Sequence, residues 1–322
     1  MKEPATPSCW VLTDGAAGNR RQALALAEAL TPSIREIVVE LRPPWSWLAP
    51  RLLPGSRLAL GGRDDALLPP WPTLAIGCGR IAAWATRQLR RWSGGRTLAV
   101  QLLDPRIDTR HWDLVVAPKH DELSGDNVLA SLGSLNPVDG AWLGDARAGF
   151  AAFADLPSPR LGVLIGGDMH GRPVDAATTA AFLEAVKARH ARDGGSLLVV
   201  TSRRTPAAQL PMIHAAFAGL PGFVWTSSTD GPNPYPGVLG WSDRLAVTPD
   251  SVNMLSEACA TGRPVHTLVS GPLPAKLERF HAELRATRRL HDMDAVTSDL
   301  QEPLRETVAI AEKVRAHLGL GA

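Results

Sequence analysis

One stretch of the sequence combines a helix start with a carboxylate a short distance inside the helix: TPDSVNMLSEACATGRP, residues 248–264. Asp250 or Ser251 is placed to cap this helix, and Gly262 is placed to end it. The unpaired N–H groups and the dipole of a helix N-terminus favour a negatively charged ligand. We therefore expect an anion site where this helix begins.

Glu257 gives the same helix a second candidate role. It follows Ser251 by six residues, which is about 9 Å along the helix axis, and its side chain tilts back toward the N-terminus. A carboxylate there would accept hydrogen bonds from both ribose hydroxyls of a nucleotide whose diphosphate lies at the helix start. The alternative is a solvent-exposed glutamate in a good helix-forming position. A capping box is excluded, because that position is Met254, and we favour the ribose contact.

Three further loops of the second half follow predicted strands. Arg203 and Arg204 offer forked donors to a phosphate, with an interdomain salt bridge as the alternative. The glycines of GGD, 166–168, suit a phosphate cradle or a tight turn. The GPNPY loop, 231–235, holds the single tyrosine and is either a base- or sugar-stacking loop or a rigid connector. The expected donor-side residues are Gly166, Gly167, Ser202, Arg203, Arg204, Asn233, Tyr235, Thr248, Asp250, Ser251, Ser256 and Glu257.

Loops of the first half supply candidates for proton transfer. Asp14, in DGAAGN, is our first choice of catalytic base, and an Asp-Gly turn with Asn19 capping the next helix is an equal alternative. His120 is the second choice, although it adjoins Asp121 and neighbours in sequence rarely face each other. Asp104 of LDPR is favoured as a turn residue. The expected acceptor-side residues are Gly15, Gly18, Asn19, Arg80, Asp104 and Arg106.

These loops require alternating strands and helices to position them. Apolar runs bounded by turn residues predict strands at 9–13, 34–40, 73–77, 97–103 and 113–118, and again at 161–165, 197–201, 223–226, 244–248 and 265–269. Helical patterns at 20–30 and 81–92 lie between the early strands. Such alternation predicts an α/β protein with parallel sheets, whose carboxyl-terminal edges carry ligand-binding loops.

Length and composition indicate two domains. A chain of 322 residues exceeds the size at which a single core stops growing, roughly 250–300 residues. The segment 149–160 contains two prolines and loses periodicity, so we place the boundary there, with domains at 1–155 and 156–300. We expect residues 301–322 to form an amphipathic C-terminal helix that packs at the domain junction.

Charge and cysteine content exclude several classes of protein. The 34 basic and 32 acidic residues give a formal charge of +2, so no footprint for nucleic acid is present. Arg87, Arg90 and Arg91 have helical spacing, which indicates a solvated helix face, with a membrane surface as the alternative. The three cysteines lack metal-ligand spacing and should be buried thiols. Without an apolar leader or spanning run, we expect a cytoplasmic protein, or one peripheral to the inner membrane.

The segment TPDSVNMLSEA resembles the nucleotide-binding helix of GT-B glycosyltransferases such as the peptidoglycan lipid-intermediate transferase. This resemblance implies that Glu257 binds the ribose of a UDP-sugar and that Ser251 with its neighbouring backbone binds the diphosphate. Two features depart from the pattern. The N-terminal loop lacks the histidine base, and Asp250 precedes Ser251 where glycine is common. The charge of Asp250 is unfavourable beside a phosphate unless Arg203, Arg204 or a metal offsets it.

Six motifs, spread over nearly the full length, are similar to the family of the plant mitochondrial fission factor and its bacterial relatives. They are WVLTDGAAGNRRQA, QLLDPR, PKHD, TSRRTP, GPNPY and TPDSVNMLSEACATGRPV. The resemblance implies a GT-B-like fold, with two Rossmann-like domains facing a cleft. Bacterial members of the family are named as glycosyltransferases, whereas the plant member recruits a dynamin-related protein to mitochondria.

We expect an enzyme of the GT-B glycosyltransferase type, with a UDP- or GDP-type sugar donor in the second domain and an acceptor in the first. Cell-envelope glycoconjugates are the expected products, and no tightly bound metal is expected. The competing hypothesis is a non-catalytic nucleotide-binding or adaptor protein of the fission-factor type. An NAD-dependent dehydrogenase is a third, weaker hypothesis, because the GxGxxG fingerprint is missing.

Overall fold

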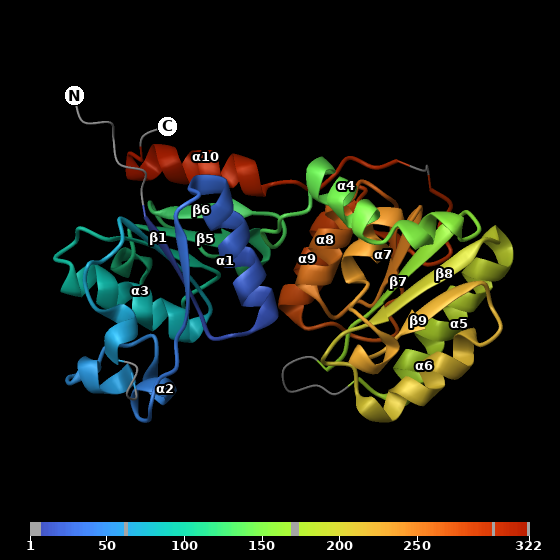
Figure 1. Ribbon diagram of the computed structural model, residues 1–322, viewed down its shortest axis with the longest axis horizontal. Coiled ribbons are helices and arrows are strands. Elements are labelled where there is room, and N and C mark those ends of the chain that lie inside the picture. The colour runs from blue at the N-terminus through green and yellow to red at the C-terminus, as the bar shows by residue number, and fades with distance from the viewer. Residues whose placement is uncertain (1–7, 61–63, 169–173, 298–299, 321–322) are drawn as a thin grey trace. The chain divides into compact units, whose positions relative to one another are not determined.

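The computed structural model describes residues 8–60, 64–168, 174–297 and 300–320, and it divides into two compact α/β units (Figure 1). Unit 1 contains the chain up to Pro137 together with the segment from Glu306 onward, and unit 2 contains Val138–Arg305. The chain therefore leaves unit 1 once, builds unit 2, and returns.

Unit 1 is built on a parallel sheet of six strands in the order β2-β1-β3-β4-β5-β6. Its strands are β1 (Cys9–Thr13), β2 (Ile34–Val38), β3 (Leu74–Cys78), β4 (Leu98–Leu102), β5 (Leu114–Pro118) and β6 (Val128–Ser131). Its helices are α1 (Ala17–Leu30), α2 (Trp45–Leu48), α3 (Arg80–Trp92) and α10 (Thr307–Leu318), with 3-10 turns η1 (Ser56–Leu60), η2 (Asp64–Leu67), η3 (Thr109–His111) and η4 (Lys119–Asp121). The five strands predicted for the first half are confirmed to within two residues, whereas the edge strand β6 was not predicted.

Both faces of this sheet are buried, because side chains alternate along each strand. From β1, Val11 packs with Leu26 of α1 and Ile310 of α10. Its neighbour Leu12 packs on the opposite face with Trp84 of α3. Burial on two faces explains why these strands read as continuous apolar runs. The cysteines are free and buried, as predicted.

Helix α10 belongs to unit 1. Just before it, the carboxylate of Glu306 accepts the N–H of Leu132 at 2.9 Å and the N–H of Gly133 at 3.0 Å. Further along, Arg315 donates to the carbonyl oxygens of Ala29 and Leu30 at the end of α1. The C-terminal segment thus completes the core of unit 1 and is not a separate element.

Unit 2 repeats the architecture with a second six-stranded parallel sheet, ordered β12-β11-β10-β7-β8-β9. Its strands are β7 (Arg160–Ile165), β8 (Ser196–Thr201), β9 (Gly222–Trp225), β10 (Arg244–Val247), β11 (Val265–Thr267) and β12 (His291–Asp292). Its helices are α4 (Gly140–Gly149), α5 (Ala176–Asp193), α6 (Leu210–Phe217), α7 (Tyr235–Trp241), α8 (Val252–Ala260) and α9 (Ala275–Ala286), with 3-10 turns η5 (Ala151–Asp155), η6 (Ala207–Gln209) and η7 (Ser228–Asp230). The five predicted strands are again present, and the two-residue β12 was not predicted.

The division between the units differs from the boundary expected at 155–156. Helix α4 lies in unit 2, where Trp241 Nε1 of α7 donates to the carbonyl oxygen of Arg147 at 3.1 Å. A Cβ built on Gly237 would lie 2.4 Å from the ring of Phe150, so the two segments are in close contact. The loss of periodicity at 149–160 therefore marks a turn inside unit 2, and the chain crosses between units near Pro137.

Each sheet has a topological switch point, where successive strands are added on opposite sides. In unit 1, β2 and β3 lie on opposite sides of β1, and in unit 2, β8 and β10 lie on opposite sides of β7. In open parallel sheets, ligands bind beyond the carboxyl ends of the strands at such a point. The loops after β1 and β3, and those after β7 and β10, are therefore the first places to look for a site.

Candidate functional site

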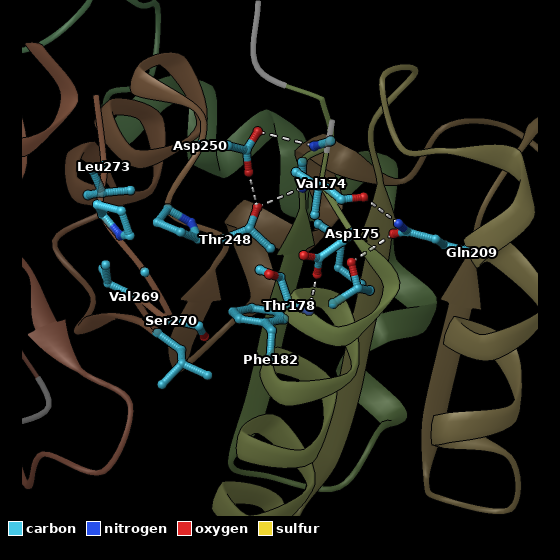
Figure 2. Close-up of a pocket in the computed structure, with 18 residues that line it drawn as sticks. Val174, Asp175, Thr178, Phe182, Gln209, Thr248, Asp250, Val269, Ser270 and Leu273 are labelled. Carbon is cyan, nitrogen blue, oxygen red and sulfur yellow. Dashed lines mark hydrogen bonds between the residues drawn. The ribbon is translucent and has the colours of Figure 1, made fainter. Parts of the chain in front are cut away.

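In unit 2, hydrogen bonds converge on Asp250 in the loop after β10 (Figure 2). Thr248 Oγ1 donates to Asp250 Oδ1 at 2.6 Å, and the Gly167 N–H donates to Asp250 Oδ2 at 3.1 Å. The Gly166 N–H donates in turn to Thr248 Oγ1 at 2.8 Å. From the loop after β8, Arg204 Nη2 lies 3.3 Å from Asp250 Oδ2. Three strand-end loops thus meet at one carboxylate, whose side chain is only 4% exposed.

The network leaves no room for a side chain at Gly166 or Gly167. A Cβ built on Gly166 would lie 2.1 Å from Asp250 Oδ2, and a Cβ on Gly167 would lie 2.0 Å from the backbone oxygen of Arg204. No side chain fits at such distances. The paired glycines do form a cradle, and the group lying in it is the carboxylate of Asp250.

The two arginines of TSRRTP have different environments. Arg204 Nη1 donates to the carbonyl oxygen of Asp168 at 3.0 Å, while its Nη2 pairs with Asp250. The N–H of Arg204 donates to Ser202 Oγ at 3.1 Å, which shapes the loop. Arg203 is exposed and has no ion pair with any described residue. Arg204 therefore offsets the charge of Asp250, and Arg203 is left available to a ligand.

Helix α8 begins as predicted. Ser251 is its N-cap, with Oγ accepting the N–H of Met254 at 3.3 Å. Asp250 is not the cap, because its carboxylate is bound to Gly167 and Thr248. A nine-residue helix capped by a neutral serine keeps an N-terminus that is favourable to an anion.

Glu257 and Tyr235 form a pair that connects α8 to α7. Glu257 is 3% exposed, and Tyr235 Oη donates to its Oε2 at 2.5 Å. Asn233 Oδ1 accepts the N–H of Tyr235 at 2.9 Å, so the GPNPY loop fixes the position of the ring. The solvent-exposed alternative for Glu257 is therefore wrong. Ser256, on the same helix, is fully buried.

A cavity of about 160 Å³ lies beside the Asp250 network (Figure 2). Thr248 and Asp250 form one side of it, the first turn of α5 another, and the loop 268–273 after β11 a third. Asp175 caps α5 by accepting the N–H of Thr178 at 2.6 Å, and this hydrogen bond lowers the pKa of Asp175. Ligand pockets are typically about 300–1,000 Å³, so this one fits a small polar group and not a whole nucleotide.

The first turn of α5 and the loop 268–273, which form two sides of this cavity, were not predicted as site elements. The sequence nevertheless contains a signal for each of them. Asp175 stands three residues before Thr178 in VDAATTAAF, which is an N-cap pattern before a helical run. The loop 268–273, LVSGPL, is another strand-end loop with Gly and Pro. Reading every strand-end loop in turn would have found it.

In unit 1, the switch point is occupied by Asp14 and Asn19. Asn19 Nδ2 donates to both carboxylate oxygens of Asp14, at 3.1 and 3.2 Å, and the Ala16 N–H donates to Oδ1 at 3.1 Å. Gly79, after β3, has a φ of +91°, and a Cβ there would lie 2.6 Å from Asn19 Nδ2. Asp14 itself is exposed. The crevice therefore presents an oriented, accessible carboxylate, which is what proton transfer needs.

Helix α1 begins earlier than predicted, at Ala17. Its N-cap is Ala16, which makes no side-chain capping bond, so the alternative that Asn19 caps this helix is wrong. Asn19 and Gly18 lie in the first turn. Gly15 has a φ of +81°, which lets the chain turn from β1 into the helix.

Two other expected acceptor-side residues, Arg80 and Asp104, have side chains that hold the local structure. Arg80 Nη1 donates to the carbonyl oxygens of Ser46 at 2.8 Å and Ala49 at 3.0 Å, which fastens α2 to α3 and turns the guanidinium away from the crevice. Asp104 Oδ1 accepts the N–H of Arg106 at 2.7 Å, the turn that the sequence favoured. Arg106 follows with a φ of +58° and an exposed side chain.

His120 is buried at the end of β5. Its Nε2 lies 3.6 Å from Asp121 Oδ1, so these sequence neighbours do approach each other, because η4 bends the chain there. The Asp104 N–H also reaches Asp121 Oδ2, at 3.4 Å. Of the two candidate bases, His120 is buried and Asp14 is exposed.

Sequence comparison finds relatives that match most of this chain. The mitochondrial fission protein ELM1 of Arabidopsis thaliana is 28% identical over 281 residues, which cover 77% of this chain and 64% of the relative. The chain therefore spans less than two thirds of that relative. A protein of uncharacterized role from Rickettsia prowazekii is 25% identical over 297 residues, covering 80% of this chain and 82% of the relative.

Solved structures share the fold at low sequence identity. A protein of Listeria monocytogenes described as a UDP-N-acetylglucosamine 2-epimerase has a TM-score of 0.53 at 11% identity, covering 99% of this chain and 98% of that one. A UDP-glucosyltransferase of Polygonum tinctorium has a TM-score of 0.51 at 12% identity, covering 99% and 93%. The two six-stranded parallel sheets with their helices are therefore a GT-B-like fold. The profile of the mitochondrial fission ELM1 family matches residues 17–318, and the chain belongs to this family.

Proposed function

We propose that the protein is a GT-B-type glycosyltransferase whose unit 2 binds the nucleotide diphosphate of a sugar donor. The observation that carries the proposal is Glu257, a carboxylate buried on a capped helix and hydrogen-bonded to the hydroxyl of Tyr235. Burying a carboxylate is costly unless polar groups satisfy it. A glutamate that already binds one hydroxyl is suited to bind the hydroxyls of a ribose.

The donor would replace two of the protein's own contacts. A ribose hydroxyl takes the place of Tyr235 Oη at Glu257, and the diphosphate lies at the start of α8 beside Ser251. Arg203 supplies the positive charge. When the Asp250 carboxylate turns away, the Gly167 N–H becomes available to a phosphate oxygen, as backbone N–H groups do in other anion cradles. The UDP-sugar proteins that share the fold support a donor of the UDP or GDP type.

Unit 1 would bind the acceptor and supply the base. The acceptor hydroxyl attacks the anomeric carbon, the bond from that carbon to the diphosphate breaks, and the acceptor proton passes to Asp14. The protein contributes orientation and charge stabilisation of the leaving diphosphate. No tightly bound metal is needed in this scheme, and cell-envelope glycoconjugates are the class of product we propose.

Isothermal titration of the protein with UDP and GDP tests the donor site. Glu257→Gln should weaken binding by about 10- to 100-fold, because a charged acceptor of hydrogen bonds is lost. The matched control is Glu312→Gln, an exposed glutamate of α10, which should leave binding unchanged. If neither nucleotide binds, or if Glu257→Gln binds as tightly as the unmodified protein, the donor-site proposal is wrong.

A second candidate function is a nucleotide-binding adaptor without turnover. The observation in its favour is that the Asp250 carboxylate fills the glycine cradle and makes an ion pair with Arg204. The cradle would then not stabilise a leaving diphosphate, so a nucleotide bound at Glu257 would not turn over. Retained nucleotide binding, with no donor hydrolysis and no transfer to a panel of acceptors, would favour this candidate over the enzyme.

A further inference from the structure

The connection between β2 and β3 in unit 1 carries much of the exposed apolar surface. Nine large apolar residues are exposed in the described part of the chain, and five of them lie between residues 38 and 68: Val38, Trp47, Leu48, Leu58 and Leu68. Trp47 is 73% exposed and Leu58 is 69% exposed. Exposed apolar residues are ordinarily scattered singly, so this concentration marks an interaction surface.

These side chains project from a packed base. Ala59 of η1 is buried with Trp84 of α3, and its carbonyl oxygen accepts the N–H of Arg42 at 2.9 Å. A Cβ on Gly55 would lie 3.6 Å from the Trp45 ring and 3.8 Å from Leu58, so α2 and η1 lie side by side. Figure 1 shows α2 next to α3, to which the carbonyl contacts of Arg80 join it. The packing of α2 and η1 against α3 therefore keeps these exposed apolar side chains on the surface of unit 1.

Arginines outnumber acidic residues around these exposed apolar side chains, since residues 38–96 contain nine arginines and three acidic residues, Glu40, Asp64 and Asp65. Residues 41–60 and 80–96 contain eight arginines and no aspartate, glutamate or lysine. Six of these arginines are exposed and make no ion pair with a described residue, and two of the six, Arg80 and Arg96, donate to backbone carbonyl oxygens. The other four are Arg42, Arg51, Arg57 and Arg91. Nine arginines against three acidic residues give this part of unit 1 a formal charge of +6, whereas the whole chain carries only +2.

A hollow of about 420 Å³ is lined by residues of the β2–β3 connection and of α3. Its wall includes Leu52, Arg87, Arg90, Arg91 and His111. Arg87 Nη1 donates to the carbonyl oxygen of Pro50 at 2.5 Å, and Arg90 pairs with Asp113 at 2.9 Å. Two of the three arginines that were expected to form a solvated face thus hold the structure together, and Arg91 remains as a free charge beside Leu52.

We propose that the α2–α3 surface, defined by Trp47, Leu48, Leu58, Arg51, Arg57 and Arg91, docks unit 1 on an anionic lipid bilayer. The exposed apolar side chains of Trp47, Leu48 and Leu58 come from two short elements, α2 and η1. They do not line a groove that would receive a helix or a strand. Tryptophan is favoured at the headgroup level of a bilayer, and arginine forks match lipid phosphates. In the described ranges no helix is long and apolar enough to cross a membrane, so the contact is peripheral.

Vesicle co-sedimentation of the full chain tests this proposal. The protein should pellet with vesicles of phosphatidylcholine and phosphatidylglycerol in equal parts, and much less with phosphatidylcholine alone. The double variant Trp47→Ser, Leu58→Ser should lower the apparent affinity at least about tenfold, because two large apolar side chains no longer enter the bilayer. Val296→Ser with Val308→Ser, two exposed valines outside this surface, is the matched control and should bind as the unmodified protein does.

The arginines give an independent readout. Arg57→Gln with Arg91→Gln should weaken binding and reduce its salt dependence, whereas Arg288→Gln, an exposed arginine of unit 2, should not. Equal pelleting with neutral and anionic vesicles, or unchanged binding of the tryptophan-leucine variant, overturns the proposal. Retention on immobilised polyglutamate with no vesicle binding would also overturn it and assign the surface to an acidic protein. None of these outcomes depends on nucleotide binding by unit 2.

Discussion

The two switch points share one topology and differ in what fills them. In unit 1, the Asp14 carboxylate is oriented by Asn19 and remains exposed. In unit 2, the Asp250 carboxylate is almost fully buried in a glycine cradle and paired with Arg204. One crevice presents its charged group to solvent, whereas the other neutralises its charged group internally.

This difference teaches that topology fixes where a ligand site is placed but not whether it is open. Parallel strands deliver their loops to the same edge in both units. The side chains after each strand then decide the rest. In unit 2 the chain supplies its own hydroxyl to Glu257 and its own carboxylate to Gly167, so the donor that we propose would have to displace both groups.

The largest effect is expected at the open crevice. Asp14→Asn keeps the hydrogen bond to Asn19 but cannot accept a proton, and we expect the rate of sugar transfer to fall by about 10²- to 10⁴-fold. Transfer is measured with a labelled UDP-sugar, and nucleotide affinity of the variant, measured by titration, should stay unchanged. An unaltered transfer rate would show that the open carboxylate is not the base.

Packing in the closed crevice is tested by Gly167→Ala. The new Cβ would lie 2.0 Å from a backbone oxygen, so we expect the free energy of unfolding in urea to fall by at least about 3 kcal/mol. At Gly79 in unit 1, a new Cβ meets the side chains of Asn19 at 2.6 Å and Asp14 at 3.3 Å, and φ is positive. Gly79→Ala should therefore cost about 1–2 kcal/mol. Gly140→Ala, with nothing within 4 Å, is the control. If Gly79→Ala lowered the free energy of unfolding more than Gly167→Ala, the backbone of unit 1 and not that of unit 2 would be the more tightly packed at its switch point.

The charge in the closed crevice is tested by Asp250→Asn. Removing a negative charge beside the cradle should raise the affinity for inorganic pyrophosphate by about tenfold, since like charges disfavour each other at this range. Fluorescence or calorimetric titration gives the affinity. The same change at Asp14 should have no effect on pyrophosphate. A fall in affinity for Asp250→Asn would mean that this carboxylate assists binding.

The smallest effect is expected for Tyr235→Phe. The ring stays in place, but the hydroxyl that a ribose must displace from Glu257 is gone, and UDP should bind about two- to fivefold more tightly. Titration calorimetry on both proteins measures the change. Weaker binding would show that the hydroxyl contacts the nucleotide directly and is not a competitor.

Most of the fold could be predicted because strands buried on two faces leave continuous apolar runs between turn residues. The exceptions have physical causes. β6 (Val128–Ser131) is a half-exposed edge strand, and β12 has two residues, so neither leaves such a run. The division near Pro137 was missed because α4 joins unit 2 through close contacts at Gly237, and sequence patterns do not report contacts between distant segments.

The site was predictable where a local rule governs it. The Ser251 cap follows from residue type and spacing, and the structure has it. The bond between Tyr235 and Glu257 could not be predicted, because it joins residues that are 22 positions apart. The direction of Asp250 depends on Arg204, from another loop, in the same way. Local rules place the candidates, and tertiary contacts decide which of them a ligand can reach.

The return of the chain to unit 1 has a consequence for biosynthesis. Unit 2 is one uninterrupted segment, whereas the core of unit 1 lacks Ile310 and Val314 until α10 has been synthesised. At about 5–20 residues per second, the segment between Pro137 and Ile310 takes roughly 9–35 s to synthesise, and the apolar surface of unit 1 that α10 covers stays uncovered for that time.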